Sequence, residues 1–186
     1  KRILDINPDC EIQIYQVFAH CDSLDKILMF KPQLVIDAID ALNPKVNVLK
    51  ALYEREIPVI SSMGAALRTD LTRIHFGDLF SAKGCPLARI VRRRLRGLGV
   101  TQGIPCVYSS EPVETKAWEM PEESSGIERG RKRNILGSMS TVTGIFGLAI
   151  AHHAIEMLIG GFGCHRPEMP KDFIKRKVIK PEKRSL

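Results

Sequence analysis

The sequence predicts an α/β domain whose mainly parallel sheet is flanked by helices. Residues 34–36 and 57–60 are short, continuous apolar runs, which is typical of strands buried on both faces of a parallel sheet. Between them, residues 43–56 place apolar side chains on one helical face, and Pro44 suits a first-turn position. Strand, helix and strand at this spacing predict a βαβ unit and therefore a parallel sheet.

Further strands and helices are expected on both sides of this unit. Residues 1–6 resemble the last turns of a helix, which Asn7 and Pro8 end. The alternating residues 11–18 predict a strand, and Ser23 is expected to cap a helix over residues 23–30. Beyond these elements we expect strands at 71–79 and 106–109, an amphipathic helix at 86–98, and a buried, closely packed helix at 138–159.

Length and composition indicate one ordinary domain, which we assign to residues 1–165. The chain has 186 residues, of which 44% are hydrophobic. Residues 111–134 are rich in Glu, Pro, Ser and Gly without a period, so a mobile loop is expected there. Residues 166–186 are expected to form a basic, poorly ordered tail. No apolar run reaches the ~18 residues of a membrane span, so no membrane is expected as a partner.

The cysteines and histidines favour a reducing compartment without a zinc site. The five cysteines, at positions 10, 21, 85, 106 and 164, form no Cys-x-x-Cys pair, so no zinc is expected. An odd count without a secretory signal fits the cytoplasm. Cys85 precedes Pro86, and an ordinary loop thiol is a better interpretation than a reactive one. His152 and His153 should point to different faces of their helix, so a shared metal ion is not expected.

The net charge of +7 is concentrated in clusters. The helix at 86–98 carries a stripe formed by Arg89, Arg92, Arg93 and Arg96, without an acid among residues 87–98. A second cluster comprises Arg131, Lys132 and Arg133, and the tail is also basic. Clustered cations fit a polyanionic partner such as RNA. A solvated helix face with a disordered tail explains the same charges, and charge alone leaves both interpretations open.

Two carboxylates and a lysine follow the strand at residues 34–36. Asp37 and Asp40 lie where that strand ends, and Lys45 lies one turn into the next helix. In an open parallel sheet, ligands bind beyond the carboxyl ends of the strands. A carboxylate there can hold Mg²⁺ and, through it, the phosphates of a nucleotide, while the lysine can reach a phosphate. The alternative is that Asp40 caps the helix and Lys45 is solvated.

The residue string of this segment carries more information than its spacing. "VIDAIDALNPK" resembles the signature of the ThiF/MoeB/HesA family of ubiquitin-activating-enzyme-like adenylating proteins. "IPVISSMGAALRTDLTRIHFGDL" is similar to the family's next strand, its glycine loop at Gly64 and the strand that follows. "CPLARIVRRRLRGLGV", "CVYSSEPV" and "GSMSTVTGIFGLAIAHHAI" resemble one branch of it, the tRNA threonylcarbamoyladenosine dehydratases.

The resemblance implies a Rossmann-like fold and an ATP-dependent, ligase-like reaction on tRNA. Enzymes of this branch activate the carboxylate of threonylcarbamoyladenosine next to the anticodon, and the activated group closes into a ring with loss of water. Carried over by motif, Asp40 is the carboxylate that holds Mg²⁺ and ATP, and Lys45 contacts the nucleotide. Asp37 has a supporting role in cofactor binding, and Gly64 lies beside the nucleotide.

The resemblance also implies what this chain lacks and what it binds. The family's glycine-rich phosphate loop would lie upstream of Lys1, so the sheet is expected to be incomplete at its N-terminal side and residues 1–186 alone are expected to be inactive. A homodimer and a sulfur-relay protein are further expected partners. Two other functions stay open, namely a sulfur-carrier-protein adenylyltransferase and a non-catalytic, basic RNA-binding or dimerisation remnant.

Overall fold

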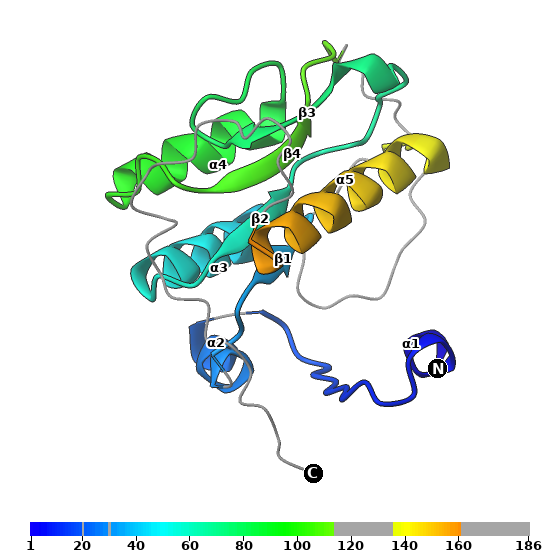
Figure 1. The fold of residues 1–186 in the computed structure, drawn as a ribbon. Coiled ribbons are helices and arrows are strands. Elements are labelled where there is room, and N and C mark those ends of the chain that lie inside the picture. Colours follow the sequence, from blue (N-terminus) through cyan, green and yellow to red (C-terminus); the bar gives the residue numbers. More distant parts are fainter. Residues whose placement is uncertain (20, 30, 114–135, 161–186) are drawn as a thin grey trace, which may run out of the picture.

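The computed structural model describes residues 1–19, 21–29, 31–113 and 136–160, and Figure 1 shows their arrangement. Four strands form one sheet in the order β1-β2-β4-β3. These are β1 (Val35–Asp37), β2 (Val59–Ser62), β4 (Pro105–Ser109) and β3 (Ile74–Asp78). Neighbours β1, β2 and β4 run parallel, whereas β3 pairs antiparallel with β4. The predicted α/β class and mainly parallel sheet are therefore confirmed.

Helices cover both faces of the sheet. One face packs against α2 (Cys21–Leu28), α3 (Leu42–Glu54) and α4 (Pro86–Gly97), and α5 (Ser140–Leu158) contacts β2 and β4 from the other. Successive strand residues alternate between the two cores, because side chains on a strand point to opposite faces. Val59 and Cys106 enter the core under α3 and α4, whereas Ile60 and Val107 enter the core under α5.

Most predicted elements occur with shifted ends, and one does not occur. The short helix α1 (Arg2–Ile6) ends at Asn7 as expected. The helix predicted from Ser23 begins at Cys21, and the Ser23 hydroxyl donates to the carbonyl of Phe18 at 2.7 Å. The strand predicted over residues 71–79 is divided into η1 (Leu71–Arg73) and β3. The strands at 57–60 and 106–109 and the helix at 43–56 each shift by one or two residues, within the range on which assignments differ.

The strand predicted over residues 11–18 is wrong. None of these residues is in a strand, and Ile14 and Phe18 are exposed. Alternating hydrophobicity makes a strand only where another strand pairs with its backbone, and residues 11–18 pair with none of the described strands, so β1 remains an edge of the sheet. The same edge position explains why Ile36, predicted to be buried, is half-exposed.

The helix α5 is less buried than predicted. Val142, Phe146, Ile150 and Ala154 face the sheet, but Leu148 on the opposite side is 71% exposed. By length and composition α5 is also apolar enough to cross a membrane, although its buried stripe packs on β2 and β4. The sequence could not distinguish a buried core helix, a half-exposed helix and a membrane span, because α5 is apolar on nearly all sides.

Candidate nucleotide and RNA site

The parallel strands bring three loops to one edge of the sheet. Because β1, β2 and β4 run parallel, their carboxyl ends lie at the same edge. The segments that follow them are 38–41, 63–70 and 110–113. The candidate site is built from these segments and from the first turns of α3 and α4.

A buried ion pair lies where β1 ends. The Lys45 Nζ atom lies 2.5 Å from Asp37 Oδ2 and donates to Ser61 Oγ at 3.2 Å. The Ser61 hydroxyl also donates to Asp37 Oδ2 at 2.6 Å, and all three side chains are buried. The other carboxylate oxygen of Asp37 accepts the backbone N–H of Ile39 at 3.0 Å. Asp37 and Lys45, which the sequence analysis assigned separately to a strand end and to a phosphate contact, are thus in direct contact.

Strand pairing explains why these three side chains meet. Asp37 and Ser61 are register partners on β1 and β2, and Lys45 lies in the first turns of α3, which packs over the same strands. A buried charge is costly unless it is paired and hydrogen-bonded, and here each charged group has at least two polar contacts. The pair holds the start of α3 against the sheet. Lys45 is fully buried, so the solvated lysine that the sequence left open is excluded.

Asp40 and Gly64 lie in the loops that leave this edge. Asp40 is exposed between β1 and α3, and the residue at the N-cap of α3 is Ala41. Gly64 follows β2, and a Cβ added there would lie 3.7 Å from Leu87 Cβ, an ordinary contact. Packing therefore does not require glycine at this position. Asp40 therefore presents an exposed carboxylate at the carboxyl edge, in the loop that precedes α3.

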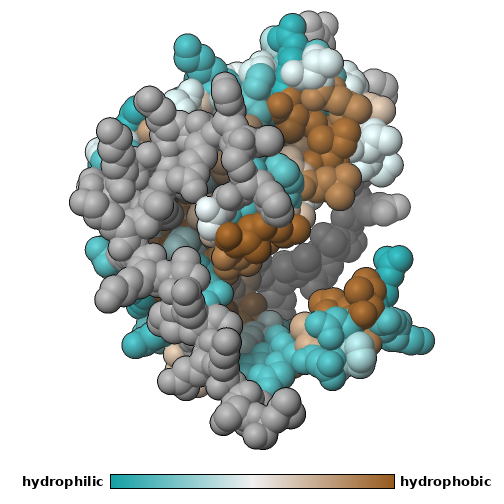
Figure 2. Space-filling view, viewed as in Figure 1, coloured by the Kyte–Doolittle hydropathy of each residue, from teal (hydrophilic) through white to brown (hydrophobic). Residues whose placement is uncertain are grey.

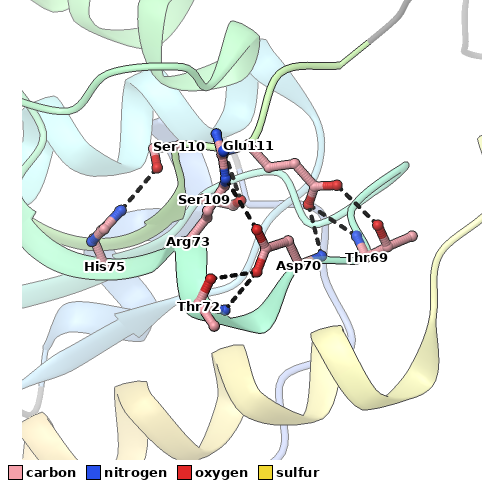
Figure 3. Close-up of polar contacts among 8 residues, drawn as sticks. All are labelled: Thr69, Asp70, Thr72, Arg73, His75, Ser109, Ser110 and Glu111. Carbon is pink, nitrogen blue, oxygen red and sulfur yellow. Dashed lines mark hydrogen bonds and ion pairs between the residues drawn. The ribbon is translucent and has the colours of Figure 1, made fainter.

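A second polar cluster at this edge was missed by the sequence analysis (Figure 3). The Glu111 carboxylate accepts the backbone N–H groups of Thr69 and Asp70 at 2.9 and 3.0 Å, and the Thr69 hydroxyl at 3.0 Å. The Asp70 carboxylate accepts the backbone N–H and hydroxyl of Thr72 and the Nε–H of Arg73. These contacts join the segment after β2 to the segment after β4. The only signal for Glu111 in the sequence was its place in the string "CVYSSEPV", which assigns it no role.

The two carboxylates of this cluster are held in their charged form. Hydrogen bonds from the backbone of Asp70 and Thr69 lower the pKa of Glu111 below its usual range. The hydroxyl and backbone N–H of Thr72 lower the pKa of Asp70 in the same way. Hydrogen bonds to a carboxylate favour its ionised form. Glu111 therefore joins the two segments most firmly when it is charged, and the charged Asp70 holds the turn at residues 70–73.

Arg68 lies buried beside this cluster. Its Nη2 donates to the carbonyl of Gly84 at 3.3 Å, but its Nε and Nη1 atoms are buried without a hydrogen-bond partner. Gly84 has a φ of +76°, and a Cβ there would lie 2.5 Å from the carbonyl oxygen of Ser110, so only glycine fits. A buried guanidinium with unpaired N–H groups is costly. No ion pair of Arg68 is found among the residues that the structure describes.

The predicted arginine stripe on α4 is only partly free. Arg92 does not belong to the exposed stripe. Its Nη1 turns inward and donates to the carbonyls of Leu79 and Ala82 at 3.2 and 2.5 Å. Arg96 lies over the ring of Phe80, with 5.7 Å between the guanidinium carbon and the ring centroid. The sequence could not show this, because the contacts of the outer face of α4 depend on how residues 79–82 fold back.

The remaining arginines of α4 are exposed. Arg89 and Arg93 reach solvent, and neither forms an ion pair within the described part of the chain. Arg94, which the stripe did not include, donates to the side-chain oxygen of Asn43. Arg131, Lys132 and Arg133 lie outside the described residues, as do the tail and all but residues 111–113 of the predicted loop.

The two cysteines near the site are structural. Cys85 is buried at the N-cap of α4, where its sulfur accepts the backbone N–H of Ala88 at 3.4 Å. Cys106 lies in β4, and burial raises the pKa of its thiol. Reactive cysteines have a lowered pKa and access to solvent. Burial of both sulfurs favours packing, in line with the interpretation of Cys85 as an ordinary thiol.

The carboxyl edge of this sheet combines a buried acid–lysine pair, an exposed acid and a glycine loop. Ligands of open, mainly parallel sheets bind at this edge, and nucleotide-binding α/β proteins are a class that binds them there. A profile of the ThiF family matches residues 1–184, and the chain belongs to this family. The predicted resemblance is thus confirmed.

The relatives share one name. The chain is 32% identical over 160 residues to the tRNA threonylcarbamoyladenosine dehydratase of Bacillus subtilis, covering 85% of this chain and 63% of the relative. It is 33% identical over 165 residues to dehydratase 2 of Saccharomyces cerevisiae, covering 81% of this chain and 36% of the relative. The Escherichia coli dehydratase TcdA in complex with ATP superposes with a TM-score of 0.70 at 28% identity, covering 86% of this chain and 61% of that chain. The chain therefore spans less than two thirds of these relatives.

Proposed function

We propose that this chain takes part in the ATP-dependent dehydration of threonylcarbamoyladenosine in tRNA, next to the anticodon. The reaction activates the carboxylate of the modified base by ligase-like adenylation and closes it into a ring with loss of water. The observation that carries the proposal is the Asp37–Lys45–Ser61 network at the carboxyl edge, which stands beside the exposed Asp40. The names of the relatives and the ATP complex of one of them support it.

The donor set at this edge fits a magnesium nucleotide. Mg²⁺ prefers carboxylate oxygens, and Asp40 offers an exposed carboxylate on a loop that leaves a parallel strand. Bound ATP would supply a leaving group for the carboxylate of the substrate. Asp40 would hold Mg²⁺, and Gly64 would leave space beside the nucleotide.

Lys45 and Asp37 have a supporting role in this proposal. The Lys45 Nζ has three donors, and Asp37 and Ser61 already engage two of them in a buried position. The lysine therefore acts first by holding the loop that presents Asp40. A phosphate contact would need the fully buried Nζ to become accessible when a nucleotide enters.

The exposed arginines of α4 fit the tRNA backbone. Arg89 and Arg93 lie four residues apart on one face of the helix, which starts at the same edge of the sheet as the Asp40 loop. Phosphate contacts position a nucleic acid without reading its bases. Arg131, Lys132 and Arg133 would extend this surface. Arg92 and Arg96 would support it through their contacts with residues 79–82.

A homodimer through α5 accounts for the exposed apolar side of that helix. Figure 2 shows hydrophobic surface on the side of the molecule where α5 runs, and Leu148, Ile155 and Ile159 are more than half exposed. Exposed apolar patches of this kind mark interaction sites. We propose a second copy of the chain as the partner of α5, rather than a membrane.

The cytoplasm, with its reduced thiols and its tRNA, is the proposed compartment, and a sulfur-relay protein is a further expected partner.

Mass spectrometry of the substrate nucleoside tests the function. The whole protein, including any residues encoded before Lys1, is incubated with Mg-ATP and tRNA that carries threonylcarbamoyladenosine. We expect the nucleoside to lose one water and ATP to be consumed. Asp40→Asn should abolish both with an unchanged circular dichroism spectrum, whereas Asp9→Asn, at another exposed acid, should not. Adenylation of a small protein with a Gly-Gly tail, without change in the tRNA, would instead favour the sulfur-carrier function.

A further inference from the structure

Two histidines and a glutamate converge near the carboxyl end of α5, away from the site described above. The Nδ1 atom of His153 lies 2.8 Å from Glu156 Oε2, and the Nε2 atom of His152 lies 3.6 Å from the same oxygen. All three donor atoms lie within 4.8 Å of one another. Neither the nucleotide site nor the arginines of α4 use these side chains.

The two histidines were expected to be too far apart to share a metal ion, but both contact the same glutamate. Their Cβ atoms leave the helix in different directions, but Glu156 lies three and four residues further on, within reach of both. The two rings meet edge to face with centroids 5.2 Å apart. The imidazole of His153 also stacks on Phe76 of β3, at 3.5 Å between centroids and 19° between planes. Phe76 therefore holds one ring in place, while His152 is exposed in the single chain, on the side of α5 proposed above to meet a second copy.

Two imidazole nitrogens and one carboxylate oxygen are ligands that zinc accepts. Ligand atoms at about 2.0–2.1 Å from a tetrahedral Zn²⁺ lie roughly 3.4 Å apart. The 3.6 Å between His152 Nε2 and Glu156 Oε2 is close to this value, whereas the 2.8 Å between His153 Nδ1 and the same oxygen has to widen. The two imidazole nitrogens lie within 4.8 Å of each other. We propose that His152, His153 and Glu156 bind one Zn²⁺ ion, with the fourth position open to solvent or another ligand.

Binding of Zn²⁺ would replace the hydrogen bond between His153 and Glu156 with two metal–ligand bonds. A zinc-bound imidazole is neutral, so any proton that His153 Nδ1 shares with Glu156 leaves when the ion enters. The ion would cross-link two successive turns of α5. Because His153 stacks on Phe76, it would also strengthen the attachment of these turns to β3. A ligand that binds only the folded state raises the melting temperature. The simpler interpretation, a pair of histidine–glutamate contacts without an ion, predicts no such rise.

Calorimetric titration of the metal-stripped protein with Zn²⁺ separates these interpretations. We expect one ion per chain at this site and a higher melting temperature in its presence. His152→Ala and Glu156→Gln should each weaken the Kd at least ~10-fold, as the removal of one ligand of three implies. Glu156→Gln keeps the shape of the side chain, and circular dichroism verifies the fold of both variants. His75→Ala removes another exposed histidine and should bind like the wild type.

Cys164 and His165, outside the described residues, are the competing donors. A Cys164→Ser/His165→Ala variant should keep the Zn²⁺ affinity of the wild type. Co²⁺ in place of Zn²⁺ should give visible bands without a thiolate charge-transfer band. The proposal is overturned if this double variant loses the tight site, if a thiolate band appears, or if Glu156→Gln binds Zn²⁺ as tightly as the wild type.

Discussion

Lys45 Nζ lies 2.5 Å from Asp37 Oδ2, and neither side chain has contact with solvent. The two residues are eight positions apart in sequence, and they join the end of β1 to the beginning of α3. Asp40 lies in the segment between them. The pair therefore sets the geometry of the loop from which the proposed ligand of Mg²⁺ projects.

Removing one member of this pair should be costly, and removing both should cost less. Lys45→Met leaves a buried carboxylate uncompensated, so we expect the free energy of unfolding to fall by about 3–5 kcal/mol. Asp37→Leu should have a similar effect, and the double variant should recover a large part of the stability. Urea unfolding of the four proteins measures the coupling. Strictly additive effects would contradict a direct interaction.

Stability should depend on the charge of Glu111. Because hydrogen bonds lower its pKa in the folded state, Glu111 stabilises the fold above its ordinary pKa, and this contribution is lost as the pH falls towards the lowered value. The wild type should exceed Glu111→Gln in stability at neutral pH, and the difference should shrink below about pH 4.3. Melting temperatures of both proteins between pH 7 and pH 3 check this. A difference that grows in acid would contradict the assigned hydrogen bonds.

Arg68 should be replaceable by an apolar residue of similar length. Arg68→Met removes two buried N–H groups that lack partners, together with one hydrogen bond to Gly84. We expect the midpoint of urea unfolding to stay the same or to rise, because two buried N–H groups without a hydrogen-bond partner are removed. A decrease in the free energy of unfolding above roughly 2 kcal/mol would show that the guanidinium has a partner in solution.

The exposed arginines of α4 should contribute to tRNA affinity equally for all tRNAs. Arg89→Glu with Arg93→Glu should weaken binding and flatten the fall of log affinity with log salt by about one unit for each phosphate interaction that is removed. Lys26→Glu with Lys31→Glu changes the net charge equally at another surface and should leave the slope unchanged. Filter binding over a salt series decides this. Equal slopes for wild type and the arginine variant would indicate a solvated helix face.

A charge on the exposed side of α5 should prevent self-association. Leu148→Glu should convert a dimer to a monomer in sedimentation at micromolar concentration, because burying an unpaired carboxylate in an apolar interface is unfavourable. Leu71→Glu, at an exposed apolar residue outside α5, should remain dimeric. A wild type that is monomeric at these concentrations would count against the proposed interface.

Local patterns predicted the elements whose order makes this fold. The apolar runs at β1 and β2 and the helical face between them required a parallel pair, because a short strand–helix–strand unit has few other ways to bury its hydrophobic side chains. Asp37, Asp40 and Lys45 could be placed at the carboxyl edge for the same reason. Family membership was recognisable from short strings of residues, and the match to the family profile agrees.

Long-range contacts decided what the local patterns left open. The alternation of residues 11–18 does not give a strand, since no neighbour pairs with its backbone in the described structure. Arg92 turns inward because residues 79–82 fold beneath it. The two histidines meet at Glu156 because it lies three and four residues further along α5, within reach of both.

The sequence by itself determined the α/β class, the order of most elements and the edge at which charged residues collect, because these depend on periodicity and on short connections. Only the tertiary structure decided which charges are buried and paired. Lys45 and Ser61 are 16 residues apart, and Glu111 is 42 residues from Thr69, yet both pairs are in hydrogen-bond contact. Contacts over such separations depend on strand register and on helix packing, which no local pattern contains.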